Sequence, residues 1–195
     1  LKPATSPYGE TKQLGEKMIR EQLETGAIIL RYFNPVGAHP SGLIGELPIG
    51  VPQNLIPYLT QTAIGQRDSL KVFGTDYNTQ DGTCIRDYIH VLDLAKAHIA
   101  ALTRLLSNRK TDVYNIGTGE GHSVLEVINT FEKVSGIDLR VKYTNRRAGD
   151  IESIYADCSK ASLTLKWDLK YTLGDALKHA WQWEKGLHET KAEAA

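Results

Sequence analysis

The sequence lacks the features that would place the protein in a membrane, on nucleic acid or in an oxidising compartment. Its only two cysteines, Cys84 and Cys158, lie far apart, which favours reduced thiols over a structural disulfide. Positive and negative charges balance at 23 Lys+Arg against 23 Asp+Glu, so nothing points to nucleic acid or a membrane surface as a partner. No apolar run is long enough to span a bilayer, and the first residues do not resemble a signal peptide. We therefore predict a cytoplasmic protein.

Two kinds of site are also missing from the sequence. The histidines show no metal-ligand spacing, and even His90 and His98 are too far apart to share one helical metal face. No glycine-rich nucleotide loop occurs either. The nearest approach, from Gly117 to Gly121, lacks the third glycine and the acidic residue that such a loop requires. We predict a tight strand-to-helix connection there, and no metal site.

Apolar strand patterns alternate with helical patterns along the chain, which indicates an α/β fold. We predict strands at 27–33, 70–73, 113–116 and 140–143, and helices at 7–23, 58–65, 91–106, 124–135, 159–165 and 172–186. Asn34-Pro35 should end the first strand, Ser123 should cap the fourth helix, and the tail after Gly186 should be frayed. The glycine- and proline-rich run from 36 to 57 predicts a long loop, and such loops are usually functional.

Tyr8 and Lys12 are the first candidates for chemistry. Residues four apart on a helix share one face. A lysine ammonium near the phenol would lower the pKa of the tyrosine, so that it could deprotonate a substrate hydroxyl nearer neutral pH. Taken alone, the pair is better explained as an exposed Tyr–Lys contact that contributes about 0.2–0.5 kcal/mol. A functional interpretation therefore needs support from the surrounding sequence.

Three longer strings supply that support. They run from Leu30 to Gly42 (LRYFNPVGAHPSG), from Asp81 to Val91 (DGTCIRDYIHV) and from Arg146 to Asp150 (RRAGD). With the Tyr-x-x-x-Lys pair before them, the chain resembles the extended short-chain dehydrogenase/reductase superfamily, and within it the UDP-glucose 4-epimerase family. The resemblance extends from about Thr5 to Lys185, which is nearly the whole chain.

The resemblance implies a fold, an activity and a cofactor. Residues 1–35 would be the last piece of a Rossmann-like NAD-binding sheet, and residues 36–195 a smaller mixed α/β domain for a UDP-sugar, with segments returning to the sheet. The activity would interconvert UDP-galactose and UDP-glucose by reversible hydride transfer between C4 and tightly held NAD, through a 4-keto intermediate. Tyr8 would be the base and acid, and Lys12 would tune it and contact NAD. Tyr32 and Phe33 would lie beside the nicotinamide.

The resemblance also implies a UDP-sugar site. Guanidinium groups match phosphate oxygens, and two arginines stand at the family's diphosphate positions. The substrate-binding residues implied are Asn34, Asn54, Leu55, Val72, Phe73, Arg86, Tyr88, Arg147, Asp150 and Ile154. From the residues alone, Arg86 could instead pair with Asp87 or Asp93, and Arg146 with Arg147 could form a solvated basic pair. We leave the role of Arg146 open.

Several of these positions have a second interpretation. Asn34 follows a strand, where parallel sheets bind ligands, and also suits a turn before proline. Asn54 and Leu55 match a family Asn-Asn-Leu motif whose first position is Gln53 here, so no role is predicted for Gln53. Phe73 would fit core packing, and Asp150 would fit a cap.

Ile154 matches the family position that limits the size of the sugar's 2-substituent. Isoleucine is fairly bulky, so we predict a preference for plain UDP-glucose and UDP-galactose over N-acetylated sugars.

Part of the family pattern does not occur in this sequence. The glycine-rich loop that holds the NAD pyrophosphate, and a serine or threonine that assists the tyrosine, should lie well before Tyr8. We expect a missing N-terminal NAD-binding segment, unpaired edges on the strand at 27–33, and no activity unless that segment is supplied. The helix at 7–23 would carry half of a homodimer interface in the complete enzyme. The alternatives are another nucleotide-sugar dehydratase or decarboxylase of the superfamily, or an inactive UDP-sugar-binding fragment.

Overall fold

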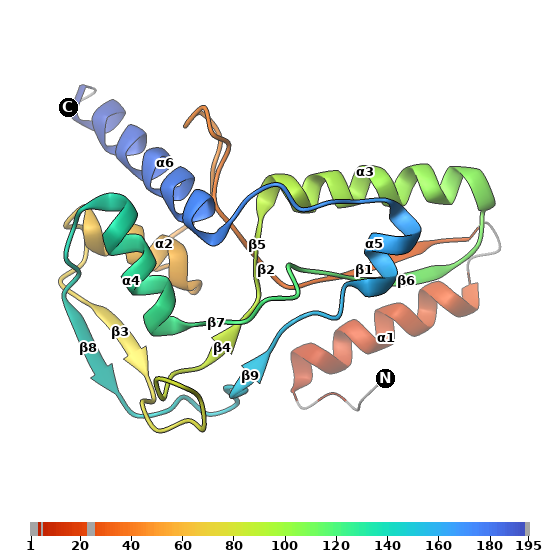
Figure 1. The fold of residues 1–195 in the computed structure, drawn as a ribbon, viewed down its shortest axis with the longest axis horizontal. Coiled ribbons are helices and arrows are strands. Elements are labelled where there is room, and N and C mark those ends of the chain that lie inside the picture. The colour runs from red at the N-terminus through yellow and green to blue at the C-terminus, as the bar shows by residue number, and fades with distance from the viewer. Residues whose placement is uncertain (1–3, 5, 23–25, 194–195) are drawn as a thin grey trace.

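The structure is a computed structural model that describes residue 4, residues 6–22 and residues 26–193 (Figure 1). Helices and short strands alternate, so the predicted α/β class is confirmed. Thr5 and Leu23, at which the family resemblance and the first helix were expected to begin and end, lie outside the described residues. The elements are α1 (Pro7–Gln22), β1 (Ile28–Tyr32), β2 (Asn34–Val36), α2 (Leu55–Ala63), β3 (Leu70–Phe73), β4 (Ile85–Arg86), β5 (Tyr88–His90), α3 (Val91–Asn108), β6 (Asp112–Ile116), β7 (His122–Ser123), α4 (Val124–Ser135), β8 (Val141–Thr144), β9 (Ser153–Ile154), α5 (Ser159–Leu165) and α6 (Leu173–Glu193).

The first structural layer is the parallel pair β1–β6, with α3 on one side and α1 on the other (Figure 1). The Arg31 guanidinium on β1 donates to both carboxylate oxygens of Glu16 on α1, at 2.6 and 2.5 Å, and these hydrogen bonds lower the pKa of Glu16. Because β1 pairs with β6, one of its edges is paired, in contrast to the expectation of unpaired edges. Within the described residues, no second strand pairs with β1. Tyr114 and Ile116 of β6 are fully buried in the small core of this layer.

The first strand ends at Tyr32, just before Asn34-Pro35 as predicted, but a separate short strand, β2, begins at Asn34 and was not predicted. The Phe33 amide donates to the Ile116 carbonyl of β6, and the Asn34 amide donates to the Asp87 carbonyl. β2 then pairs in parallel with β5, and Asn34 lies opposite Tyr88. The extended segment thus leaves one partner strand and joins another, which carries it from the first layer toward the second core.

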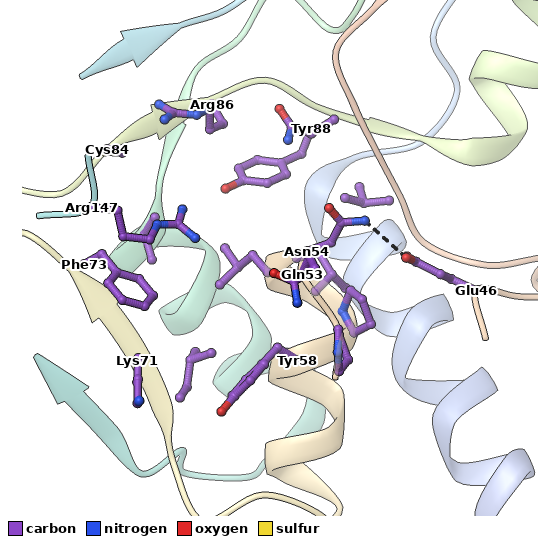
Figure 2. A pocket seen from close by; sticks show the side chains of 18 of the residues that line it. Glu46, Gln53, Asn54, Tyr58, Lys71, Phe73, Cys84, Arg86, Tyr88 and Arg147 are labelled. Atoms are coloured by element: carbon purple, nitrogen blue, oxygen red, sulfur yellow. Dashed lines mark hydrogen bonds between the residues drawn. The ribbon is translucent and has the colours of Figure 1, made fainter. Parts of the chain in front are cut away.

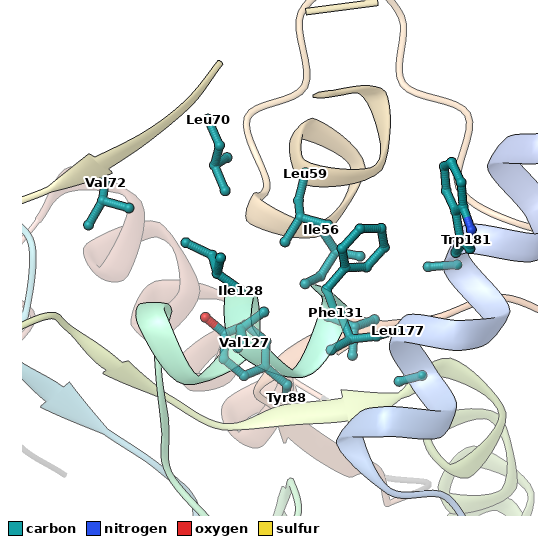
Figure 3. Close-up of a cluster of buried hydrophobic side chains, with 13 residues drawn as sticks. Ile56, Leu59, Leu70, Val72, Tyr88, Val127, Ile128, Phe131, Leu177 and Trp181 are labelled. Carbon is teal, nitrogen blue, oxygen red and sulfur yellow. The ribbon is translucent and has the colours of Figure 1, made fainter. Parts of the chain in front are cut away.

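The second core lies among α2, α4, α6 and the parallel pair β3–β8 (Figure 3). Phe131 of α4 meets Trp181 of α6 edge to face, with ring centroids 5.8 Å apart. Leu59, Leu70 and Leu177 fill the space around them and are almost completely buried. Each such side chain contributes about 1.5–3 kcal/mol relative to an exposed one, so this cluster fixes the three helices against β3.

The ends of α4 agree with the prediction, whereas the start of α2 and the end of α6 differ from it. Ser123 accepts from the Glu126 amide as predicted, and Gly136 ends α4 in the left-handed region, at φ 72°. α2 begins at Leu55 rather than near residue 58, because the first turn of a helix tolerates Pro57, whose missing N–H has no partner there. α6 continues to Glu193, so the frayed tail expected after Gly186 was wrong. No helix in the described segments is both long and apolar enough for a membrane crossing.

Candidate functional site

A cavity of about 520 Å³ opens between α2, β3, β4 and the loop before α2 (Figure 2). The elements around it come from distant parts of the sequence, and the second core holds α2 and β3 in place behind it. Eight of the ten side chains predicted to bind substrate line this cavity: Asn34, Asn54, Leu55, Phe73, Arg86, Tyr88, Arg147 and Asp150. The predicted substrate residues are therefore gathered around one space, although this placement does not test their individual roles.

One carboxylate holds both arginines of the cavity wall. Arg147 donates through Nε and Nη2 to the two oxygens of Asp150, at 3.0 and 3.2 Å. Arg86 Nη2 lies 4.0 Å from the same carboxylate and its Nη1 donates to the Ile85 carbonyl. The ion-pair partner of Arg86 is thus neither Asp87 nor Asp93, the two alternatives left open by the sequence. Two guanidinium groups share one carboxylate, so this wall carries a surplus of positive charge suited to a diphosphate.

Aromatic rings complete the same wall. The guanidinium carbon of Arg147 lies 4.6 Å from the centroid of the Phe73 ring, so Phe73 faces the cavity instead of serving only as core. Tyr88 is buried, and this burial raises its pKa to about 12. Tyr88 therefore remains protonated at neutral pH and can donate a hydrogen bond but cannot act as a base. The wall offers two rings and two guanidinium groups, which together suit an aromatic base joined to phosphates.

The loop before α2 supplies the mouth of the cavity. Asn54 is the N-cap residue of α2 but makes no side-chain cap bond, and its amide donates to Glu46 at 3.2 Å. The loop is attached to α6 because the Trp183 indole donates to the Glu46 carbonyl at 2.8 Å. Gly45 is required there, since a Cβ at this position would meet the Trp183 ring at 2.3 Å. Gln53 also lines the cavity, although no role was predicted for it.

Two predicted substrate residues do not line the cavity. The Val72 side chain is 1% exposed and belongs to the second core, so any part it has in binding rests on its main chain. Ile154 lies on β9, paired with Arg86 in the three-stranded sheet, and is 39% exposed. It is thus adjacent to the wall that carries Arg86 and Arg147 without lining the cavity itself.

The four predicted NAD residues lie in the first layer, away from this lining. Lys12 Nζ lies 5.1 Å from the centroid of the Tyr8 ring, which confirms the predicted proximity of the pair on one helical face. Tyr8 is 72% exposed and Lys12 is also exposed. Tyr32 is 53% exposed at the end of β1, and Phe33 next to it is half-buried. None of the four is among the described residues that line the cavity.

The structure also resolves the role that the sequence left open for Arg146. Its Nε donates to Asp76 at 2.7 Å, and the guanidinium lies 4.0 Å from the centroid of the Tyr77 ring. The hydrogen bond to Asp76 raises the pKa of Arg146, which is absent from the cavity lining. Arg146 therefore holds the polar turn after β3, and Arg147 alone of the basic pair faces the cavity.

Two of the histidines, His90 and His179, contact each other. His90 is buried at the N-cap of α3, where its Nδ1 accepts from the Leu92 amide, and its Nε2 lies 3.0 Å from His179 Nδ1. This contact joins residues 89 apart, so spacing along the chain could not reveal it. In the described part of the chain, no group of three or more His, Cys, Asp or Glu side chains is arranged to hold a metal ion.

Besides Gln53, sequence reasoning missed the polar side chains of Glu46, Tyr58 and Lys71 in the lining. A signal was present for Lys71, because side chains two apart on a strand share one face and Phe73 was already assigned to the site. No local pattern distinguishes Glu46 within its loop.

Comparison with known proteins agrees with this geometry. The NAD dependent epimerase/dehydratase family matches residues 1–117, and the chain belongs to that family. The chain is 49% identical to UDP-glucose 4-epimerase of Bacillus subtilis and 49% identical to that of Homo sapiens, in each case over 93% of its length. It covers only 55% and 53% of those two proteins, so it spans about half the length of the relatives it matches.

Solved structures give the same result for the fold. A UDP-glucose 4-epimerase from Stenotrophomonas maltophila, with bound NAD and formylated UDP-arabinopyranose, is 44% identical with a TM-score of 0.90 and matches 96% of this chain and 57% of its own. The enzyme from Bifidobacterium longum, in complex with NAD+ and UDP, is also 44% identical with a TM-score of 0.90, over 95% of this chain and 56% of its own. The predicted relation to Rossmann-type epimerases is therefore confirmed for the fold.

Proposed function

We propose that this chain is the UDP-sugar-binding and catalytic-tyrosine portion of a UDP-glucose 4-epimerase. The observation that carries the proposal is the wall formed by Arg86, Arg147 and Phe73, where two guanidinium groups and an aromatic face converge on one cavity. The proposal includes the division into a Rossmann piece at 1–35 and a substrate domain at 36–195. It also includes a cytoplasmic homodimer as the complete enzyme.

The wall suits each part of a UDP-sugar. The base would lie against Phe73, and the diphosphate would accept from Arg86 and Arg147, because planar guanidinium groups match phosphate oxygens. Asp150 holds both arginines now, and its two oxygens keep further lone pairs that could accept from ribose hydroxyls. Arg147 is already stacked on Phe73, so little side-chain order would be lost on binding.

The chemistry would take place at Tyr8. Tyr8 would accept the proton of the sugar 4-hydroxyl and return it, and the nearby Lys12 ammonium would favour the phenolate. Exposed side chains at Tyr8, Lys12 and Tyr32, with Phe33 beside them, fit a nicotinamide nucleotide lying across α1 and the end of β1. Bound NAD would supply reversible hydride transfer at the sugar C4. Ile154, beside Arg86, would favour sugars without an N-acetyl group.

A second candidate is a UDP-sugar-binding protein without turnover. The observation in its favour is that Tyr8 is 72% exposed and lies outside the cavity lining, so binding groups and catalytic groups are not yet in one space. The two candidates agree on ligand binding and differ only in conversion.

Binding is tested by titrating the chain with UDP in a calorimeter. Arg147→Ala should weaken UDP binding about tenfold to a hundredfold, because a charge-assisted hydrogen bond contributes about 1.5–3 kcal/mol. Arg140→Ala is the matched control, since Arg140 is exposed and does not line the cavity. If UDP binds and the two variants behave alike, the assignment of the diphosphate wall is wrong. If UDP does not bind at all, the proposed function is wrong for this chain.

Turnover is tested by incubating the chain with UDP-galactose and NAD and separating UDP-glucose by chromatography. We expect no conversion by the chain alone, and conversion once the N-terminal segment of a relative is added. Conversion by the chain alone would show that the segment is unnecessary and would exclude the binding-only candidate. Binding of UDP with no conversion under either condition would favour the binding-only candidate.

A further inference from the structure

A second cavity, of about 370 Å³, lies beyond the first and is lined mainly by polar side chains: Tyr58, Gln66, Arg67, Asp68, Ser69, Lys71 and Lys142. Tyr58 and Lys71 line both cavities. Figure 2 shows these two side chains at the end of the first cavity opposite Arg86 and Tyr88. The second cavity is therefore a distinct space that adjoins the first and lies at the end farther from Arg86.

Three cationic side chains and one carboxylate face the second cavity. Among the described residues, none of the three cations, Arg67, Lys71 and Lys142, has a carboxylate within ion-pair distance. Even Asp68, in the same lining, lies beyond that distance from all three. Elsewhere in the described chain, seven other lysines and arginines do have such a partner. The cavity thus has a positive surplus that the protein itself does not neutralise.

Two of these cations are held beside each other by the sheet. Lys71 of β3 and Lys142 of β8 are register partners in a parallel pair, so their side chains project from the same face of the sheet. Like charges on paired positions repel and are destabilising. An anion between them would remove that repulsion, and their placement at one cavity provides the space for it.

Two contacts hold the Arg67 guanidinium in place at the same cavity. Its guanidinium carbon lies 4.6 Å from the centroid of the Tyr58 ring, and its Nε donates to Gln61 Oε1 at 2.8 Å. Stacking and this hydrogen bond fix the plane of the group, and its two terminal nitrogens remain as donors. A fixed guanidinium presents these donors in the fork that matches two oxygens of a phosphate.

We propose that this second cavity binds the phosphate group of a small molecule, with Arg67 as the fork and Lys71 and Lys142 as point charges. Tyr58 and Lys71 lie between the two cavities, so an anion here also changes the charge and side-chain freedom at the end of the UDP-sugar site. The ligand class is a free phosphate or a phosphate monoester, and the two share the dianionic group that this lining recognises.

The test is a titration of the ¹⁵N-labelled chain followed by amide chemical shifts. Inorganic phosphate and glucose 1-phosphate are the two probes, each against chloride at equal ionic strength. We expect shifts at Arg67, Lys71 and Lys142 with both probes. Lys142→Gln should weaken binding about fivefold, because an exposed charge pair contributes modestly and salt screens it. Lys133→Gln, at an exposed lysine of α4 outside both cavities, is the matched control and should leave binding unchanged.

Arg147→Ala separates this proposal from the proposed function. Phosphate shifts that persist in Arg147→Ala and diminish in Lys142→Gln support a second site, and the probe that binds more tightly identifies the source of the phosphate. Shifts that vanish in Arg147→Ala and persist in Lys142→Gln place the phosphate in the UDP-sugar cavity and overturn the proposal. The absence of shifts at millimolar probe also overturns it. UDP-induced shifts at Phe73 and Arg147 report on the proposed function independently.

Discussion

Replacing Asp87 by asparagine should destabilise this fold strongly although the two side chains are nearly the same size. Asp87 is fully buried between the motif residues Arg86 and Tyr88. Its Oδ1 accepts from the amide and hydroxyl of Thr118, at 2.8 and 2.7 Å. Its Oδ2 accepts from the amides of Gly119 and Ala156, at 3.0 and 3.1 Å. One carboxylate therefore joins the β4–β5 segment to the loop after β6 and to the segment after β9.

The magnitude follows from the number of donors. Asparagine keeps one oxygen, so its NH₂ group would face two of the four donors in either orientation. If it faces Gly119 and Ala156, two buried amides lose their acceptor at a cost of about 1–3 kcal/mol each. We expect a loss of about 4 kcal/mol in the free energy of unfolding. For a chain of this size that corresponds to a fall of about 8–16 °C in Tm.

The assay is urea unfolding followed by circular dichroism, repeated as a thermal scan. Asp138→Asn is the control, because Asp138 is exposed and its substitution removes the same negative charge. Asp87→Asn should also weaken UDP binding, because the segment that Asp87 anchors carries Arg86 and Tyr88. A loss below about 1 kcal/mol, within the range of ordinary surface substitutions and their errors, would refute the reasoning that the four donors depend on a carboxylate.

Two further predictions concern the histidine contact and the tyrosine. Burial, followed by the neighbouring His179, lowers the pKa of His90 to about 4, so the stability that depends on neutral His90 is complete above pH 6.5 and is lost as the pH falls toward 4. Between pH 7 and pH 5 the wild type should lose about 2 kcal/mol more than His90→Asn, which keeps a capping oxygen and cannot titrate. Equal losses in urea unfolding would contradict the assignment. In the conversion assay with the N-terminal segment supplied, Tyr8→Phe should lower the rate about 10²- to 10⁴-fold and leave UDP affinity unchanged. Tyr143→Phe, at another exposed tyrosine, is the control, and an unchanged rate in Tyr8→Phe would exclude Tyr8 as the base.

The sequence was most informative where structure is locally determined. α4 has the predicted Ser123 cap and the predicted bounds of 124–135, since a serine cap and the left-handed Gly136 act within one turn of the helix. The strand at 70–73 has the predicted bounds. Arg86 and Arg147, which the long motifs assigned to one site, line one cavity, because strings of this length carry information about the whole fold.

Features that depend on distant partners were not predictable. β2 exists only because β5 pairs with it, and β4, β7 and β9 have two residues each, too few for any periodic pattern. The pairing of Arg86 with Asp150, and the contact of His90 with His179, join segments that no spacing rule connects. The second, cationic cavity likewise depends on the register of β3 with β8.

The residues proposed for binding and those proposed for proton transfer are held by different parts of this fold. Asp150, Phe73 and the β4–β5 segment hold the arginine wall through contacts that lie entirely between residues 34 and 156. Tyr8 is instead held by α1, which the Glu16–Arg31 pair links to the sheet. Changes in the arginine wall should therefore alter substrate affinity, whereas changes at Glu16 or Arg31 should alter the position of the tyrosine and hence the rate. A variant of Glu16 that changed UDP affinity as much as Arg147→Ala would show that the two parts are coupled more tightly than these contacts imply.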